Sequence, residues 1–189
     1  MAGSVLMAAC LASPVACGDA PASDSGTDEG EPADPDPTLE TLAACDESDF
    51  GGTPFMGPSF DPETGELAVA LPSSYVVATT AGWARPEAEH QEALGSASEE
   101  VSGVVFESPG LLGARFGGSE ACGSARTLTL WESQEALMNF VWGEVHGGAM
   151  SLTDTTTLGW ETTRWVESSA EPPTWDQARA ALEDARAEP

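Results

Sequence analysis

The sequence predicts an α+β domain of the ferredoxin-like type, with elements in the order β-α-β-β-α-β. Three observations support this class: four short runs of β-branched and aromatic residues, two stretches with apolar residues at helical spacing, and a glycine-rich turn between the two middle strands. We expect a four-stranded antiparallel sheet with helices on one face and an extra C-terminal helix. All six tryptophans lie between Trp83 and Trp175, so the core is expected in this part of the chain.

The first half of the pattern is strand, helix, strand. Residues 75–83 (YVVATTAGW) are typical of a strand. Pro86 suits the first turn of a helix, which is expected to continue to about Phe106. The tripeptide Ser-Pro-Gly at 108–110 ends it, and residues 111–116 form the second predicted strand.

The second half repeats the pattern after a hairpin. Gly117 to Ser124 suits a tight turn, and residues 125–131 form the third predicted strand. Ser133 is a favourable N-cap for a second helix, which weakens at Gly147-Gly148. The fourth strand is expected at 159–166. Beyond two prolines, Thr174 is expected to cap a last helix over residues 175–186.

The N-terminus has the character of an export signal. Residues 4–15 are apolar but too few to span a bilayer, which needs about 20 helical residues. We therefore predict a signal peptide over residues 1–17 that ends at Cys17, as in the lipobox of bacterial lipoproteins. Cys10 is a second candidate, and ordinary secretion or a cytoplasmic location are the alternatives. The predicted location is the bacterial cell envelope, with contact to the membrane through the lipid anchor only.

Two further regions precede the domain. Residues 18–44 are rich in Asp, Glu, Pro, Ser and Gly, which indicates a disordered acidic tether. Residues 45–74 are expected to form an irregular segment leading into the ferredoxin-like domain at 75–189. Cys45 and Cys122 remain if Cys10 is cleaved away and Cys17 is acylated. In an oxidising compartment they form one disulfide or stay as two free thiols.

The charge of the chain excludes several partners. The formal net charge is −26 and no lysine occurs, so nucleic acids and anionic membrane surfaces would be repelled. The sequence contains no HExxH, CxxC, P-loop, GxGxxG or GxSxG motif. We therefore predict neither a metal site nor a cofactor.

Three segments carry a family resemblance. They are SPGLLGARF (108–116), LTLWESQEALMNFVWGEVHGGAM (128–150) and TTRWVESSAEPPTWDQARAALEDAR (162–186). In their order they resemble an uncharacterised branch of the dimeric α/β-barrel superfamily, which includes the antibiotic-biosynthesis monooxygenases. The likeness covers about 110 residues, from Tyr75 to Arg186. The superfamily implies a homodimer, often packed sheet to sheet, and a pocket between the sheet and helices of each protomer. Several of its enzymes oxygenate aromatic or polycyclic substrates without a metal, whereas others handle haem.

The predicted site centres on His146. Met138, Trp142 and His146 recur every four residues on one predicted helix, so the first two could line an apolar pocket around the imidazole. A histidine there could accept a proton from a phenol or ligate haem. The alternative is a half-buried histidine bound to a backbone carbonyl. Arg126, on a predicted strand, could clamp a ligand carboxylate or form an ordinary salt bridge; Arg115 and Arg164 share this ambiguity.

Two functions follow as hypotheses. The first is an oxygenase-like enzyme that acts on an aromatic or polycyclic small molecule with His146 as the general base. The second is a non-catalytic module anchored in the envelope, which binds a small apolar ligand or a protein partner. The enzyme requires a closed apolar pocket containing His146, whereas the module does not.

Overall fold

A computed structural model describes residues 35–188 of the 189-residue chain. Within these residues the strands form one antiparallel sheet in the order β1-β3-β4-β2-β5. The strands are β1 (Gly51–Gly52), β2 (Tyr75–Ala84), β3 (Leu111–Ser119), β4 (Ser124–Trp131) and β5 (Thr157–Glu167). The order β3-β4-β2-β5 with β2 in the interior is the ferredoxin-like arrangement.

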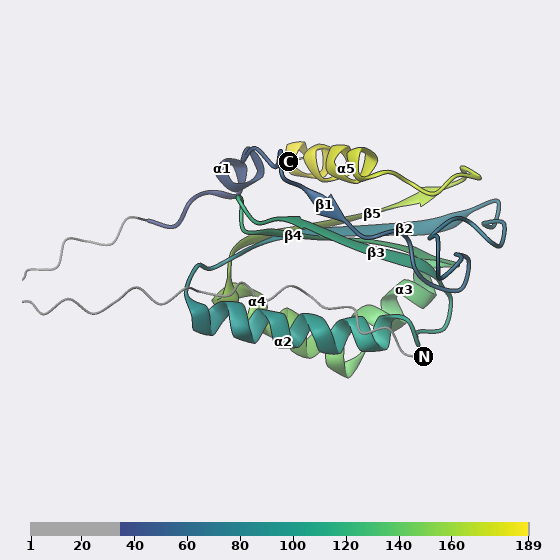
Figure 1. Cartoon of the computed structure of the whole chain (residues 1–189), viewed down its shortest axis with the longest axis horizontal. Helices are drawn as coiled ribbons and strands as arrows, with labels where there is room; N and C mark the ends of the chain where they lie inside the picture. Colours follow the sequence, from purple (N-terminus) through teal and green to yellow (C-terminus); the bar gives the residue numbers. More distant parts are fainter. Residues whose placement is uncertain (1–34, 189) are drawn as a thin grey trace, which may run out of the picture. The chain divides into compact units, whose positions relative to one another are not determined.

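Helices lie on both faces of the sheet (Figure 1). They are α1 (Leu39–Ala43), α2 (Ala88–Val105), α3 (Gln134–Val141), α4 (Glu144–Thr156) and α5 (Trp175–Ala187). On one face, here called the α2 face, lie α2, α3 and α4; on the other, the α5 face, lie α1 and α5. The prediction that the sheet carries helices on one face holds for the ferredoxin-like unit, and the extra C-terminal helix covers the opposite side.

The sheet has five strands, so the prediction of four was wrong. The fifth, β1, pairs with β3 through Gly51↔Gly118 and Gly52↔Gly117. A Cβ on Gly117 would lie 2.6 Å from the Phe50 ring, and one on Gly52 would lie 2.5 Å from Trp175 Nε1. Only glycine allows these backbones to approach so closely. A two-residue strand of glycines has no side-chain pattern, which is why the sequence did not indicate it.

Alternation along β2 divides the core between the two faces. Tyr75 and Val77 pack on the α5 face with Phe55, Leu128 and neighbouring residues, whereas Val76 packs on the α2 face. The α2-face cluster also contains Val105, Leu111, Ala114, Trp131 and Leu137. A third cluster, around Trp83 and Leu182, joins the far end of β2 to α5. The β-branched and aromatic residues that predicted this strand are therefore buried on both of its faces.

The tether predicted for residues 18–44 ends earlier than expected. Residues 39–43 form α1, which Thr38 caps by accepting a hydrogen bond from the backbone N–H of Thr41. Leu39 and Leu42 pack against the cluster of Trp83 and Leu182. These apolar side chains, absent from the more acidic residues before them, explain why the segment folds onto the domain. The predicted signal peptide and residues 18–34 of the predicted tether lie outside the described residues.

The helix predicted after Ser133 is two helices. Ser133 caps α3 as expected, with its side chain accepting from Ala136 N–H. The chain then breaks at Trp142 and Gly143, and α4 starts at Glu144 with Gly143 as an extended N-cap. His146 therefore belongs to a different helix from Met138. Met138, Trp142 and His146 were predicted to follow one another every four residues along one helix, and this prediction was wrong.

The chain covers the sheet face on which sheet-to-sheet dimers would form. The α5 face carries α5, α1 and residues of the 45–74 segment, including the buried Phe55 and Phe60. Trp165 of β5 and Trp175 of α5 pack against the same cluster. A second protomer would have to displace this apolar layer to reach the sheet. A homodimer remains a prediction, but it needs a different surface.

The capping box of α5 offers a test of how firmly this helix covers the sheet. The Thr174 side chain accepts from Gln177 N–H, and the Gln177 side chain accepts from Thr174 N–H, at 3.2 and 2.7 Å. Thr174→Ala is expected to lower the free energy of unfolding by about 1 kcal/mol, measured by urea denaturation. Ser169→Ala, in the exposed loop before α5, is the control; an equal loss there would contradict a specific role of the cap.

Candidate functional site

The His146 side chain is half-buried at the start of α4 and bound to the backbone. Its Nδ1 lies 3.2 Å from the carbonyl oxygen of Val141, the last residue of α3. Its ring lies 4.6 Å from that of Phe140, centre to centre. Phe140 stacks in turn on the buried Trp131 ring. The imidazole thus closes the α3–α4 junction by supplying a hydrogen bond to a helix-terminal carbonyl.

Burial lowers the pKa of His146 below its ordinary value of 6.5, and the Val141 carbonyl only partly opposes this shift. We therefore expect a neutral imidazole at pH 7, with the proton on Nδ1. Since the folded chain disfavours protonation, His146 should reduce stability as the pH falls below 6.5 towards its folded pKa. An NMR titration of the ring protons measures this pKa. A midpoint above 6.5 would contradict the burial of the ring.

The other two residues of the predicted pocket do not enclose His146. Trp142, at the junction, is 74% exposed, and Met138 is only partly buried on α3. Two hollows of the described residues, of about 320 and 290 Å³, are both open, and neither is lined by His146, Met138 or Trp142. Neither hollow is the enclosed apolar cavity that a polycyclic substrate requires.

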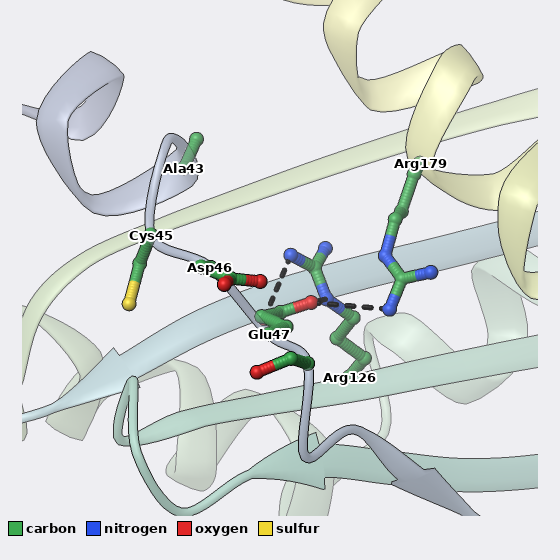
Figure 2. A pocket seen from close by; sticks show the side chains of 7 residues that line it. Ala43, Cys45, Asp46, Glu47, Arg126 and Arg179 are labelled. Carbon is green, nitrogen blue, oxygen red and sulfur yellow. Dashed lines mark hydrogen bonds and ion pairs between the residues drawn. The ribbon is translucent and has the colours of Figure 1, made fainter.

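Arg126 lies in the larger hollow, where it clamps a carboxylate of its own chain (Figure 2). Its Nε lies 3.2 and 3.1 Å from the two oxygens of Glu47, and its Nη2 lies 3.0 Å from Oε1. Arg179 of α5 reaches the same carboxylate at 3.2 Å, and the Ser124 hydroxyl donates to it at 2.5 Å. Donors from the first residues of β4 and from α5 therefore converge on Glu47. Arg126 therefore binds a carboxylate through two nitrogens, but the carboxylate belongs to Glu47 of the same chain and not to a ligand.

Two of the three charged side chains of this ion cluster, those of Arg126 and Glu47, are buried. The side chains of Arg126 and Glu47 are only 7% and 9% exposed, whereas Arg179 is 34% exposed. Burial alone would raise the pKa of Glu47, but hydrogen bonds from Arg126 and Ser124 outweigh it, and the pKa lies below its ordinary value. The carboxylate is therefore ionised at neutral pH. Arg179 also stacks on Phe50, 4.4 Å from the ring centre.

The residues around Glu47 form a short strap, here defined as residues 45–52. A disulfide joins its first residue, Cys45, to Cys122, with the Cα atoms 6.0 Å apart. Asp49 accepts hydrogen bonds from the Ser119 hydroxyl and the Ala121 N–H, which lowers its pKa. The last two residues of the strap are strand β1. The strap is thus held at four successive points over the β3–β4 hairpin.

Arg115 is held differently, between two aromatic rings. Its guanidinium carbon lies 4.5 Å from the centre of Phe55 and 4.6 Å from that of Trp175. It donates to the Pro173 carbonyl at 2.7 Å, and no carboxylate in the described part of the chain pairs with it. Burial lowers its pKa to about 10, so it stays charged at neutral pH. Arg115 fastens the start of α5 to the sheet by cation–π contact.

Comparison with known proteins gives likenesses to solved structures only. No known family profile matches the sequence, and no curated protein sequence does either. One similar structure is described as an antibiotic biosynthesis monooxygenase (12% identity, 51% of this chain and 99% of that one, TM-score 0.43). A second is Rv0793 from Mycobacterium tuberculosis (12% identity, 53% of this chain and 99% of that one, TM-score 0.45). A third is SO0527 from Shewanella oneidensis (8% identity, 51% of this chain and 93% of that one, TM-score 0.46).

The alignment with a Fusobacterium nucleatum protein named as a candidate monooxygenase spans about half of that chain, 49%. All these likenesses concern proteins whose sequences share little with this one. The ferredoxin-like assignment therefore rests on the strand order and ladders of this chain itself.

Residues 35–188 contain no group of three or more His, Cys, Asp or Glu side chains arranged to hold a metal ion. None of their helices combines the length and apolar character needed to cross a membrane.

Sequence reasoning missed Glu47 and Arg179, the residues that form the ion cluster with Arg126. Glu47 lies in the acidic run CDESD, where nothing in its spacing distinguishes it from the acids beside it. Arg179 lies on α5, far from Arg126 in the sequence. The nearest signal was Cys45: a disulfide to Cys122 would bring the acidic run to the β3–β4 hairpin, beside Arg126 on β4.

Proposed function

We propose that this chain is an exported envelope lipoprotein whose folded domain is a non-catalytic protein-interaction module. One observation carries the proposal: helices cover both faces of the sheet, so neither face is free to bind a small ligand. The two open hollows of about 320 and 290 Å³ in the described residues are not lined by His146. The imidazole is bound to Val141 at a helix junction, which is a structural role. The buried arginines have internal partners, so they too serve the fold.

Export and anchoring are tested on the full chain expressed in a bacterial host. Radiolabelled palmitate should enter the chain, and Cys17→Ser should abolish this incorporation. Cys10→Ser is the matched control and should incorporate label like the unaltered chain. If palmitate incorporation depends on Cys10, Cys10 and not Cys17 is the lipidated residue. If neither the unaltered chain nor either variant incorporates palmitate, the chain carries no lipid anchor.

A feature of His146 favours an oxygenase as the second candidate. Because Nδ1 faces the Val141 carbonyl, the lone pair of the neutral ring lies on Nε2, which hydrogen-bonds to no group in the described part of the chain. Such a nitrogen can accept a proton. The 74% exposure of Trp142, which was predicted to line a pocket around it, argues for the module.

Oxygen uptake and thermal shift separate the two candidates. The protein is assayed with a panel of phenols and polycyclic quinones, beside His146→Gln, which keeps a polar side chain. The module predicts neither uptake nor a shift in melting temperature. Uptake that His146→Gln abolishes, with the melting temperature retained, would establish the enzyme and overturn the module.

A further inference from the structure

Within residues 35–188, the outer strand β5 is open along its edge, and four of its side chains are exposed on the α2 face. It is eleven residues long and pairs with one described strand, β2. From Trp160 to Val166 its four even-numbered residues share the α2 face, because they pair with β2 residues such as Val76 and Ala78 that pack there. All four are exposed, with Trp160 at 40% and Val166 at 71%. The set is Trp160, Thr162, Arg164 and Val166.

This strip differs in charge from the rest of a very acidic chain. It contains no carboxylate, since Glu161 and Glu167 lie on the α5 face, where Glu161 pairs with Arg186 at 2.7 Å. Arg164 pairs with no carboxylate among the described residues. An exposed arginine and an exposed tryptophan thus stand on one open strand, each without a partner.

The spacing of these two residues is self-complementary. Trp160 and Arg164 lie two positions on either side of Thr162. If a second β5 pairs antiparallel about a two-fold axis at Thr162, each Arg164 stands opposite the Trp160 of the other copy. Directly opposed residues have Cβ atoms about 5 Å apart, within the range of a cation–π contact. The two Arg164 side chains are then four residues apart along the ladder.

We propose that two copies of this chain associate through β5 in this register, joining their sheets into one. We infer that a second copy binds this edge, because the symmetric contact contains two equivalent Trp160–Arg164 pairs. Each exposed Trp160 and each exposed Arg164 then has a partner on the other copy. The interface differs from the α5 face, which the chain itself covers. If the domain is the interaction module proposed above, a second copy of the chain is its partner. The dimer rests on the proposed function only for this assignment.

A long edge strand without proline or lysine needs some protection from unspecific pairing, and a charge on its open face can supply it. Arg164 could therefore act as a guard that prevents association, or as the partner proposed here. The two roles predict opposite effects of removing the side chain, so mutation decides between them.

The test is sedimentation equilibrium of the purified full chain and its variants. Arg164→Ala and Trp160→Ala should each weaken dimerisation about tenfold. The exchanged double variant Trp160→Arg/Arg164→Trp recreates the same contacts and should restore it. Trp142→Ala, which removes a more exposed tryptophan outside β5, is the control and should change nothing.

Salt and cross-linking supply independent readouts. Raising NaCl from about 0.05 to about 0.5 M should strengthen the dimer, since it screens the repulsion of two acidic chains. Thr162→Cys should form a disulfide between copies on mild oxidation, mapped by mass spectrometry, whereas Thr163→Cys should not.

A chain that stays monomeric at all concentrations, or an Arg164→Ala variant that associates more strongly, would overturn the inference. Either result leaves the palmitate and oxygen-uptake tests of the proposed function unaffected.

Discussion

Replacing Glu47 by alanine is expected to lower the free energy of unfolding by about 3–5 kcal/mol, because it leaves the guanidinium of Arg126 buried without its counter-ion. Arg126 is held under Trp83, 5.7 Å from the ring centre, and cannot readily turn to solvent. The loss is measured by urea denaturation at neutral pH. Asp176→Asn is the matched control: Asp176 also pairs with Arg179, at 3.3 Å, but is 94% exposed. It should change stability little.

The pH dependence of this contribution has a definite sign. The pKa of Glu47 is lower in the folded chain than its ordinary value of 4.5. Its contribution is therefore fully present above pH 4.5 and is lost as the pH falls through the folded pKa. Glu47→Gln, which keeps the shape of the side chain, should be less stable than the unaltered chain at neutral pH and converge with it in acid. A constant difference across this range would mean that packing, and not charge, holds the strap.

Removing the disulfide is the second large effect expected. Cys45 and Cys122 are 77 residues apart, so their bond closes a long loop in the unfolded chain. Cys45→Ser/Cys122→Ser should lower the free energy of unfolding by about 2–4 kcal/mol. Cys10→Ser/Cys17→Ser removes the other two cysteines and is the control. Thiol titration of the unfolded, unreduced control variant should find no free thiol; two would show that the bond is absent.

Both changes act on the strap, so their effects should not add. Once the disulfide is gone, the strap is held less firmly and Glu47 contributes less to the native state. The combined variant should therefore lose less stability than the sum of the separate losses, which a double-mutant cycle measures. Strict additivity would show that Glu47 and Cys45 hold the strap independently.

The central sheet could be predicted because its signal is local. The strand expected at 75–83 is found at Tyr75–Ala84, and that expected at 159–166 is found at Thr157–Glu167. Both contain β-branched and aromatic residues at sheet spacing, and the burial of their side chains follows that pattern. The last helix was also predicted nearly to its ends, because Thr174 gives it a clear capping signal.

What could not be predicted depends on contacts between distant residues. The break at Gly143 divides a segment whose apolar spacing fits one continuous helix, and the fold there follows from packing on Trp131. Glu47, the partner of Arg126, lies in an acidic run, and Arg179, which binds the same carboxylate, lies on α5; no spacing in the sequence connects the three residues. Even the face that α5 covers follows from where Leu182 and Ala178 find apolar neighbours.

The first described residues find their partners in the last ones. Leu39 and Leu42 pack with Leu182, Glu47 binds Arg179, and Phe50 meets Trp175 edge to face at 5.3 Å. A growing chain synthesises this N-terminal segment first, yet cannot bury it until the final helix has been made. The domain therefore cannot complete its fold before α5 has been synthesised, and until then residues 39–50 lack the contacts that bury them.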